Sequence, residues 1–184
     1  MRKLPKSFYA VPALELAEKL IGKILVRRVE GKECRARIVE TEAYVGSHDL
    51  ACHAAKGRTR RTEIMFGPGG HAYVYLIYGI HDMLNIVAGK VDDAQAVLIR
   101  AAEPLEGWNA NLSGPGKLAK ALQITRKDNG VDLSGESLFV MEDPSSRPRI
   151  ISTRRVGVDY AGEWKDCPFR FLDADSKAVS RPGF

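Results

Sequence analysis

The sequence predicts an α+β domain in which helices flank a curved, mainly antiparallel β-sheet with a protruding hairpin. Three observations predict this fold class. Stretches with strand periodicity recur along the chain, short turns suited to hairpins join most of them, and only two stretches have helical periodicity. At 184 residues the chain is long enough for one hydrophobic core and short for two, so we expect a single domain over residues 1–184.

The two predicted helices have recognisable starts. In residues 11–22, apolar residues recur at three-to-four spacing, Pro12 suits the first turn and Gly22 suits the end. The second helix begins at Gly114-Pro115-Gly116-Lys117 and runs to about residue 122. The predicted strands are residues 24–29, 33–44, 71–78, 83–88, 94–101, 137–141 and 169–172. Turns at residues 30–32 and 78–81 join neighbouring strands into hairpins.

Composition favours a protein that stays inside the cell and meets a polyanion. The net charge is +5, and no apolar run is long enough to span a membrane. We see no signal peptide and expect three reduced cysteines, so the cytoplasm or nucleus is favoured over secretion. Basic residues form three clusters, for which solvated surface charge is the alternative interpretation. The clusters are Lys56, Arg58, Arg60 and Arg61; Lys117, Lys120, Arg126 and Lys127; and Arg147, Arg149, Arg154 and Arg155.

The predicted strand over residues 33–44 ends in two acids and a phenol. At the strand period of two, one face is expected to carry Cys34, Ala36, Ile38, Glu40, Glu42 and Tyr44. The apolar start of this row predicts that the face is buried, where carboxylates are costly unless they are paired or used. Arg100 is a lone cation in an apolar strand and needs a buried anion, so a carboxylate and Arg100 could hold a water between them. The alternative is a surface position, with the acids paired to Arg35 or Arg37.

Aromatic residues and a long loop accompany these acids. Residues 46–70 lack regular periodicity, which is typical of functional loops. Tyr73 and Tyr75 share a strand face, and Tyr78 lies at an exposed hairpin tip. Their rings suit stacking on nucleobases, or they are simply strand-forming residues. Two weaker hypotheses are a metal site at His48, Asp49 and His53, and a backbone phosphate held at residues 114–117 by Lys117 and the free amides of the helix start.

Four blocks in one order resemble the alkyladenine (3-methyladenine) DNA glycosylase family. They are RIVETEAY at residues 37–44, MFGPGGHAYVYLIYG at 65–79, LIRAAEP at 98–104 and GPGKL at 114–118. The likeness continues through residues 162–164 and 170–171, so it spans nearly the whole chain. It implies a monofunctional enzyme that flips alkylated or deaminated purines out of double-stranded DNA and cuts their N-glycosidic bond.

The resemblance also implies roles for individual residues. Glu42 matches the general base that activates a water, and Arg100 matches the arginine that helps hold this water. The implied base pocket comprises Tyr44 and His53 on one side of the extruded base, Tyr75 stacking on the other, Tyr73 in the wall, and Asn85, which excludes unwanted guanine substituents. Tyr78 matches the side chain inserted where the base was. The expected DNA contacts are Tyr78, Arg58, Arg61, Lys117, Arg154 and Arg155.

We expect no metal, no cofactor and no membrane attachment, and we expect a monomer acting on duplex DNA that contains damaged purines. A non-catalytic nucleic-acid-binding module is the alternative function. A metal-dependent hydrolase that uses His48, His53 and the acids is a third. Glu42 and Arg100 discriminate between the first two, because a binding module has no use for a buried acid beside a buried cation.

Overall fold

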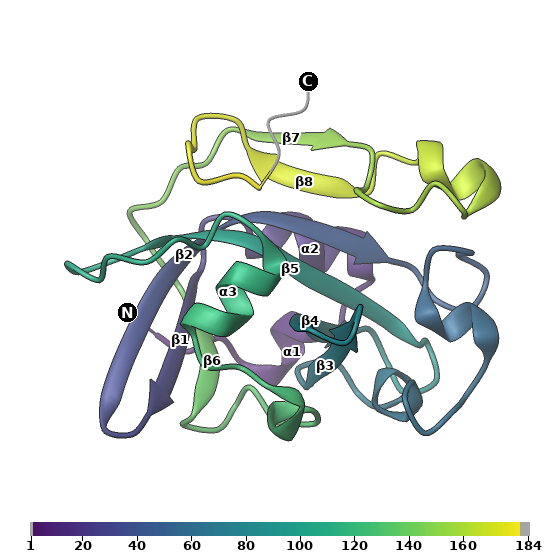
Figure 1. Ribbon diagram of the computed structural model, residues 1–184, viewed down its shortest axis with the longest axis horizontal. Coiled ribbons are helices and arrows are strands. Elements are labelled where there is room, and N and C mark those ends of the chain that lie inside the picture. The colour runs from purple at the N-terminus through teal and green to yellow at the C-terminus, as the bar shows by residue number, and fades with distance from the viewer. Residues whose placement is uncertain (1, 181–184) are drawn as a thin grey trace.

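The fold is one antiparallel sheet packed against short helices, as the computed structural model shows for the described residues 2–180 (Figure 1). The strands are β1 (Ile24–Val29), β2 (Lys32–Tyr44), β3 (Ala72–Ile77), β4 (His81–Ala88), β5 (Gln95–Pro104), β6 (Leu138–Met141), β7 (Ile150–Thr153) and β8 (Arg170–Asp173). The α-helices are α1 (Lys6–Tyr9), α2 (Ala13–Leu20) and α3 (Pro115–Ala121). Short 3₁₀ helices are η1 (His53–Lys56), η2 (Glu63–Phe66), η3 (Arg126–Asp128) and η4 (Gly162–Asp166). The predicted α+β fold with a mainly antiparallel sheet is confirmed.

Strand β2 is the centre of the sheet, whose order is β3-β4-β5-β2-β1-β6. One edge of β2 pairs with β5 along most of its length. The other edge pairs first with β1, over residues 32–37, and then with β8, over Glu40–Glu42. Strand β7 pairs only with β8, so this C-terminal hairpin extends the sheet beside the acidic end of β2 (Figure 1).

One α-helix and one strand were not predicted from the sequence. Helix α1 is a single turn of four residues, too short for a periodic pattern. Strand β7 is four residues long and half-buried, and it follows a segment rich in proline and arginine. Strand β5 also continues three residues beyond its predicted end, because Ala102–Pro104 pairs with Ala36–Ile38 of β2. The predicted helix at residues 11–22 and the strand at 33–44 are both present.

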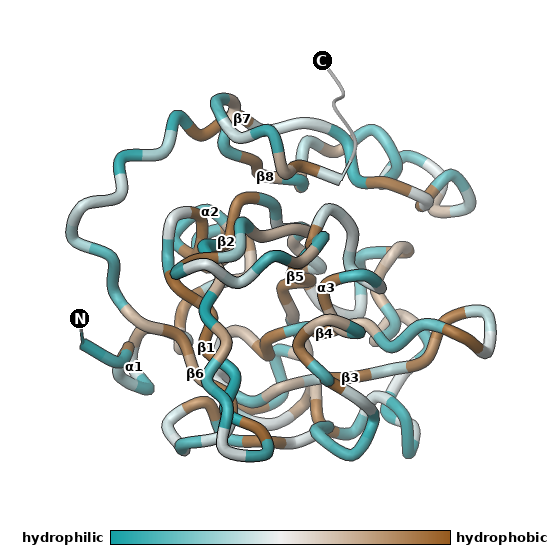
Figure 2. The backbone as a smooth tube through the Cα atoms, turned by 60° about the vertical axis from the view of Figure 1, so that its left-hand side comes forward, coloured by the Kyte–Doolittle hydropathy of each residue, from teal (hydrophilic) through white to brown (hydrophobic). Residues whose placement is uncertain are grey.

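The main hydrophobic core lies between the sheet and α2. Leu16, Ala17 and Leu20 of α2 are fully buried there. The hydroxyl of Thr41 in β2 donates a hydrogen bond to the Ala17 carbonyl at 2.9 Å, which fastens the helix to the strand. In Figure 2, hydrophobic brown segments follow much of the inner strands, while hydrophilic teal segments follow many outer loops. No helix within residues 2–180 is long and apolar enough to cross a membrane.

A local irregularity in β2 changes which way its side chains point. Ile38 is paired with Ala102, but Glu40 is next paired with Ala101 and Thr41 with Ile99. Each strand therefore contains an extra residue here, a β-bulge that breaks the alternation of side chains. Cys34, Ala36 and Ile38 pack with the α2 core, and so do Thr41 and Ala43 beyond the bulge.

The sequence-based expectation of a single face over residues 34–44 is therefore wrong. Glu40, Glu42 and Tyr44 do share a face, but it is the face opposite to that of Ala36 and Ile38. The bulge turns the two acids away from the apolar core toward the side of the sheet where Arg100 and the tyrosines lie. Without it, the alternation would place both carboxylates against α2.

Candidate active site

Two buried acids of β2 meet one arginine of β5. The carboxylates of Glu40 and Glu42 are fully buried, and the Arg100 side chain is 9% exposed. Arg100 Nε donates to Glu40 Oε1 at 3.1 Å, and Arg100 Nη1 lies 3.4 Å from Glu42 Oε1. Burial acts to lower the pKa of Arg100, but the charges of Glu42 and Glu40 outweigh it and the pKa is raised. The expected buried anion for Arg100 is therefore present.

The surface alternative for these acids is wrong. Arg35 pairs with Glu33 and Glu106. Arg37 pairs with Glu103 and Asp143. Neither arginine reaches the acidic end of β2.

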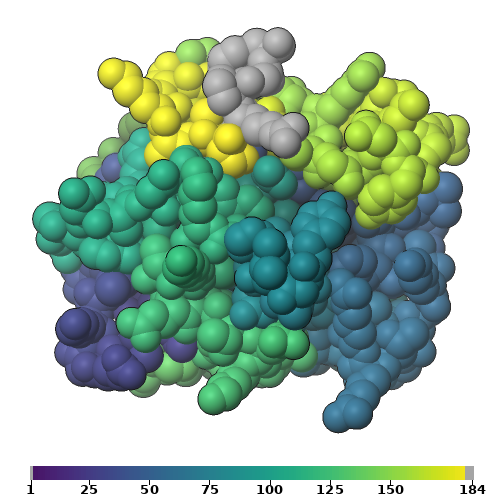
Figure 3. Space-filling view, in the orientation of Figure 1, coloured from purple at the N-terminus to yellow at the C-terminus, as the bar shows by residue number. Residues whose placement is uncertain are grey.

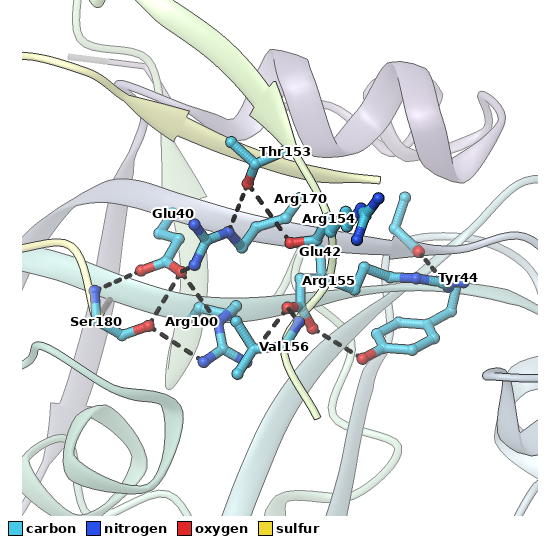
Figure 4. A network of polar contacts seen from close by, with 11 residues as sticks. Glu40, Glu42, Tyr44, Arg100, Thr153, Arg154, Arg155, Val156, Arg170 and Ser180 are labelled. Carbon is cyan, nitrogen blue, oxygen red and sulfur yellow. Dashed lines mark hydrogen bonds and ion pairs between the residues drawn. The ribbon is translucent and has the colours of Figure 1, made fainter. Parts of the chain in front are cut away.

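Glu42 has two further hydrogen-bond donors (Figure 4). The Tyr44 hydroxyl donates to Oε2 at 2.8 Å, and the backbone N–H of Val156 donates to Oε1 at 2.7 Å. Burial, followed by the negative charge of Glu42, raises the pKa of Tyr44, so this phenol stays a proton donor. Glu42 stands directly behind the wall of a pocket, because its three partners Tyr44, Arg100 and Val156 all line that pocket.

The pocket has a volume of about 160 Å³, and its wall includes five tyrosines and His53. It brings together residues from β2, β3, β4 and β5 with the loop after β7. The predicted residues that line it are Tyr44, His53, Tyr73, Tyr75, Tyr78, Asn85 and Arg100. The predicted pocket residues are thus neighbours in space, while their individual roles stay predictions.

The rings in the pocket touch one another. His53 Nδ1 lies 2.8 Å from the Tyr73 hydroxyl, and the rings of His53 and Tyr75 meet edge to face with centroids 4.5 Å apart. The rings of Tyr73 and Tyr75 are 5.4 Å apart and tilted by 37°. A planar base therefore has no gap between His53 and Tyr75 as they stand, and the predicted position between them requires these rings to part.

His53 is held in its neutral form. Burial, with smaller contributions from the positive charges of Arg61 and Lys56, lowers its pKa from 6.5 to about 4. Arg61 lies over the Tyr75 ring, 5.0 Å from its centroid, and its Nη2 is 3.5 Å from His53 Nε2. A guanidinium thus stands beside the aromatic wall.

Asn85 and Tyr78 differ sharply in exposure. Asn85 is buried, and its Nδ2 donates to the Tyr73 carbonyl at 3.2 Å. Tyr78 is 87% exposed at the tip of the β3–β4 hairpin, with a φ of 51° that is uncommon outside glycine. In Figure 3 this hairpin, in teal, lies beside the blue loop that follows β2 and the yellow-green segment after β7. The exposed tip predicted for Tyr78 is confirmed.

The predicted DNA-contacting cations fall into different environments. Arg58 is about half exposed, is ion-paired with Glu63 and Asp92, and lies over the Phe66 ring. Arg154 is exposed and pairs with Asp166 at 3.1 Å. Lys117 is exposed in the first turn of α3. Among the ion pairs within residues 2–180, none involves Lys117 or Arg61.

The predicted contact between Arg155 and DNA is wrong, because Arg155 is buried. Its side chain is 0% exposed, and its guanidinium binds both carboxylate oxygens of Asp49, at 2.5 and 2.9 Å. It also donates to the Ala43 carbonyl at 3.0 Å and lies over the Tyr44 ring. Arg155 therefore fastens the segment after β7 to the end of β2 and is not available to a phosphate.

A family model described as methylpurine-DNA glycosylase matches residues 7–177. The chain belongs to this family. Similar proteins, each named "Putative 3-methyladenine DNA glycosylase", come from Anaeromyxobacter sp. (strain Fw109-5), Myxococcus xanthus and Methanocella arvoryzae. Their identities are 53%, 50% and 47%; each match covers 98% of this chain and 94%, 95% and 97% of the relative.

Membership confirms the resemblance drawn from the four sequence blocks. The hypothesis of a metal site at His48, Asp49 and His53 is not supported, since both carboxylate oxygens of Asp49 accept hydrogen bonds from Arg155. Within residues 2–180, no group of three His, Cys, Asp or Glu side chains could hold a metal ion.

Sequence reasoning missed part of the pocket wall. Val156 contacts Glu42 through its backbone N–H, and a backbone group carries no residue-type signal. Tyr160, Met83 and Cys52 also line the pocket. Asp49 was considered only as a metal ligand, and no local pattern signals its ion pair with Arg155, which lies 106 residues further along the chain.

Proposed function

We propose that this protein is a monofunctional DNA glycosylase that flips an alkylated or deaminated purine out of duplex DNA. It hydrolyses the N-glycosidic bond and leaves an abasic site. The observation that carries the proposal is the Glu42 carboxylate. It is fully buried behind an aromatic pocket. The described residues give it two hydrogen bonds, from Tyr44 and Val156, and one ion-pair contact with Arg100, whereas a carboxylate has roughly four acceptor sites. The remaining site on Oε2 is suited to a water.

The chemistry follows from this arrangement. Arg100 and the Val156 N–H both approach Oε1 of Glu42, so a positive charge and a hydrogen-bond donor hold this carboxylate in place beside the pocket. Glu42 takes a proton from the water as the water oxygen bonds to the sugar C1′. The C1′–N bond breaks, and its electron pair leaves with the purine. The carboxylate also stabilises the positive charge that develops on the sugar.

The aromatic wall suits the leaving base. Alkylated purines that carry a positive charge stack well on electron-rich rings, and Tyr44, Tyr73 and Tyr75 supply three. A neutral His53 adds a ring without adding a repelling charge. We propose that a base entering the pocket separates His53 from Tyr75. The buried Asn85 amide beside them is then placed to reject purines with an unwanted exocyclic group.

The surface around the pocket suits duplex DNA. The chain carries a net charge of +5, and exposed Arg61 and Lys117 form no ion pair with described residues. We propose that they contact phosphates, with Arg58 and Arg154 adding to the positive field. Tyr78 at the exposed tip of the β3–β4 hairpin fills the gap left by the flipped base. We expect a monomer that needs no metal or cofactor and works where the cell keeps its DNA.

A panel of damaged duplexes tests the proposal. The protein is incubated with duplexes that contain 3-methyladenine, 7-methylguanine, hypoxanthine or ethenoadenine, and abasic sites are revealed by alkaline cleavage. We expect excision of at least one lesion. Glu42→Gln should keep its affinity for the damaged duplex while excision falls about 10³-fold, since it cannot accept the proton.

Glu33→Gln is the matched control, because Glu33 is an exposed acid of the same strand. It should excise at the wild-type rate. Near-normal excision by Glu42→Gln would remove Glu42 from the chemistry. A wild-type protein that binds damaged duplexes but releases no base would instead favour the non-catalytic binding module.

A further inference from the structure

Glu40 is the second buried acid of β2, and the general-base mechanism leaves it without a task. Four donors surround its carboxylate. Arg100 Nε and Arg170 Nη1 donate to Oε1 at 3.1 and 3.2 Å. Ser180 donates to it twice, from its hydroxyl to Oε1 at 3.0 Å and from its backbone N–H to Oε2 at 2.5 Å. The carboxylate is 0% exposed, so these donors replace water completely.

Ser180 also contacts Arg100 directly. Its hydroxyl accepts a hydrogen bond from Arg100 Nη2 at 3.1 Å while donating to Glu40 (Figure 4). The three guanidinium nitrogens of Arg100 thus have three different partners: Glu40 at Nε, Glu42 at Nη1 and Ser180 at Nη2. Three points fix a planar group in both position and orientation.

We propose that Glu40 and Ser180 are positioning residues, which hold Arg100 beside Glu42 in the geometry that the reaction uses. This inference rests on the proposed function. It gives the C-terminal segment after β8 a part in the active site, although residues 174–180 of this segment neither line the pocket nor bond to Glu42. A second serine of this segment lies outside the cluster, since the Ser176 hydroxyl donates to Glu103 of β5 at 2.6 Å and to neither Glu40 nor Arg100.

Glu40 and Ser180 are needed because Arg100 could otherwise form a different, two-pronged ion pair with Glu42. Arg–carboxylate pairs prefer two parallel hydrogen bonds, and Arg100 instead approaches Glu42 with one nitrogen at 3.4 Å. Glu40 and Ser180 engage the other two nitrogens and prevent the two-pronged pair. If the hydrogen bonds from Arg100 to Glu40 and Ser180 are lost, Arg100 can move onto Glu42 and occupy the acceptor site that a water needs. The cluster also balances two carboxylates with the two guanidinium groups of Arg100 and Arg170.

Ser180→Ala tests the inference in the full-length protein. It removes the hydroxyl but keeps the backbone N–H that donates to Glu40. We expect the single-turnover excision rate at saturating enzyme to fall about tenfold, a size typical of small losses of alignment. The affinity for damaged duplex should stay within about twofold, because Ser180 lies outside the pocket wall. Ser180→Thr retains a hydroxyl and should recover most of the rate.

Ser176→Ala is the matched control, because it removes a serine hydroxyl from the same segment without touching the Glu40 cluster. It should leave rate and affinity unchanged. Glu40→Gln, which keeps the shape of the side chain but removes its charge, should lower the rate more than Ser180→Ala. If Glu40→Gln fails to fold, the comparison of Ser180→Ala with Ser180→Thr still tests the inference. A wild-type rate for Ser180→Ala, or a Thr variant as slow as the Ala variant, would overturn the inference.

A second measurement does not depend on activity. The Nε–H signal of Arg100, assigned in ¹⁵N NMR spectra by its loss in Arg100→Lys, reports whether the guanidinium is held. Hydrogen exchange at this N–H should become faster in Ser180→Ala and stay unchanged in Ser176→Ala. An unchanged Arg100 signal in Ser180→Ala would show that Ser180 does not hold Arg100. If the wild-type protein excises no lesion, the proposed function fails, and the exchange rates still show whether Ser180 holds Arg100.

Discussion

Two buried carboxylate–guanidinium pairs lie side by side at the end of β2 and differ in how fully they are bonded. Asp49 receives four hydrogen bonds, two from Arg155, one from the Val45 N–H at 3.2 Å and one from the Ala51 N–H at 3.0 Å. Glu42 receives two, from Tyr44 and Val156, and has one looser contact with Arg100 at 3.4 Å.

This difference separates a structural pair from a reactive one. A carboxylate has about four acceptor sites, so Asp49 has none left, while Glu42 keeps one beside the pocket. Burial alone therefore does not mark a catalytic acid in this protein, since Asp49, Glu40 and Glu42 are all fully buried. The acceptor site that the described residues leave open distinguishes Glu42.

The largest expected effect is the loss of stability in Asp49→Asn. Breaking a buried pair leaves Arg155 uncompensated, so the free energy of unfolding should fall by about 3 to 5 kcal/mol. Glu42→Gln should cost much less, about 1 kcal/mol, because Arg100 keeps Glu40 as its partner. Urea denaturation of both variants measures the contrast. Equal losses in the two variants would contradict the division into a structural and a reactive pair.

The next effect is a pH dependence that comes from His53. Its pKa is 6.5 in an unfolded chain and about 4 in the folded protein, so the unfolded state binds the proton first as the pH falls. The free energy of unfolding should therefore decrease as the pH falls from about 6.5 to about 4, by on the order of 2 kcal/mol. His53→Gln should flatten this part of the curve. His81→Gln, which changes an exposed histidine, serves as the control and should keep the wild-type slope.

The sequence predicted the elements of this site better than their directions. Hydrophobic periodicity located β2, and the anomalous Arg100 in an apolar strand correctly called for a buried anion. Periodicity assumes regular alternation, however, and the paired bulges opposite each other in β2 and β5 break it. Whether Glu40 and Glu42 face the α2 core or the pocket depends on that irregularity, which no residue type in residues 38–41 announces.

Sequence patterns also failed to predict contacts between segments that are far apart in the chain. Arg154 and Arg155 are neighbours in a basic cluster, yet one is exposed and the other is completely buried against Asp49. A charge count treats them alike, because only the folded chain brings Asp49 within reach. Ser180 escaped notice for the same reason, since its partners Glu40 and Arg100 lie 140 and 80 residues away.

A smaller effect is expected for Tyr78, whose exposed ring contrasts with the buried groups. Tyr78→Asn removes the ring while tolerating the positive φ of 51°. The affinity for damaged duplex should weaken by about 1 to 2 kcal/mol, the size of one lost stacking contact. Tyr78→Phe should bind like the wild type. Neither change should lower the free energy of unfolding, because the side chain is 87% exposed. Unchanged affinity in Tyr78→Asn would remove the wedge role.

The smallest effect is expected for Lys117. This cation is exposed, whereas Arg155 is buried. Because a phosphate contact releases counterions, Lys117→Ala should reduce the slope of log affinity against log salt by about one unit, for damaged and undamaged duplex alike. Lys32→Ala, at the first residue of β2, removes the same charge and should leave the slope unchanged, because the β1–β2 hairpin end lies away from the β3–β4 hairpin (Figure 1). Equal slopes for the two variants would mean that only the net charge matters. A reduced slope for Lys117→Ala alone would place the DNA backbone at the start of α3. Arg155 is buried against Asp49, so its charge should not contribute to the slope.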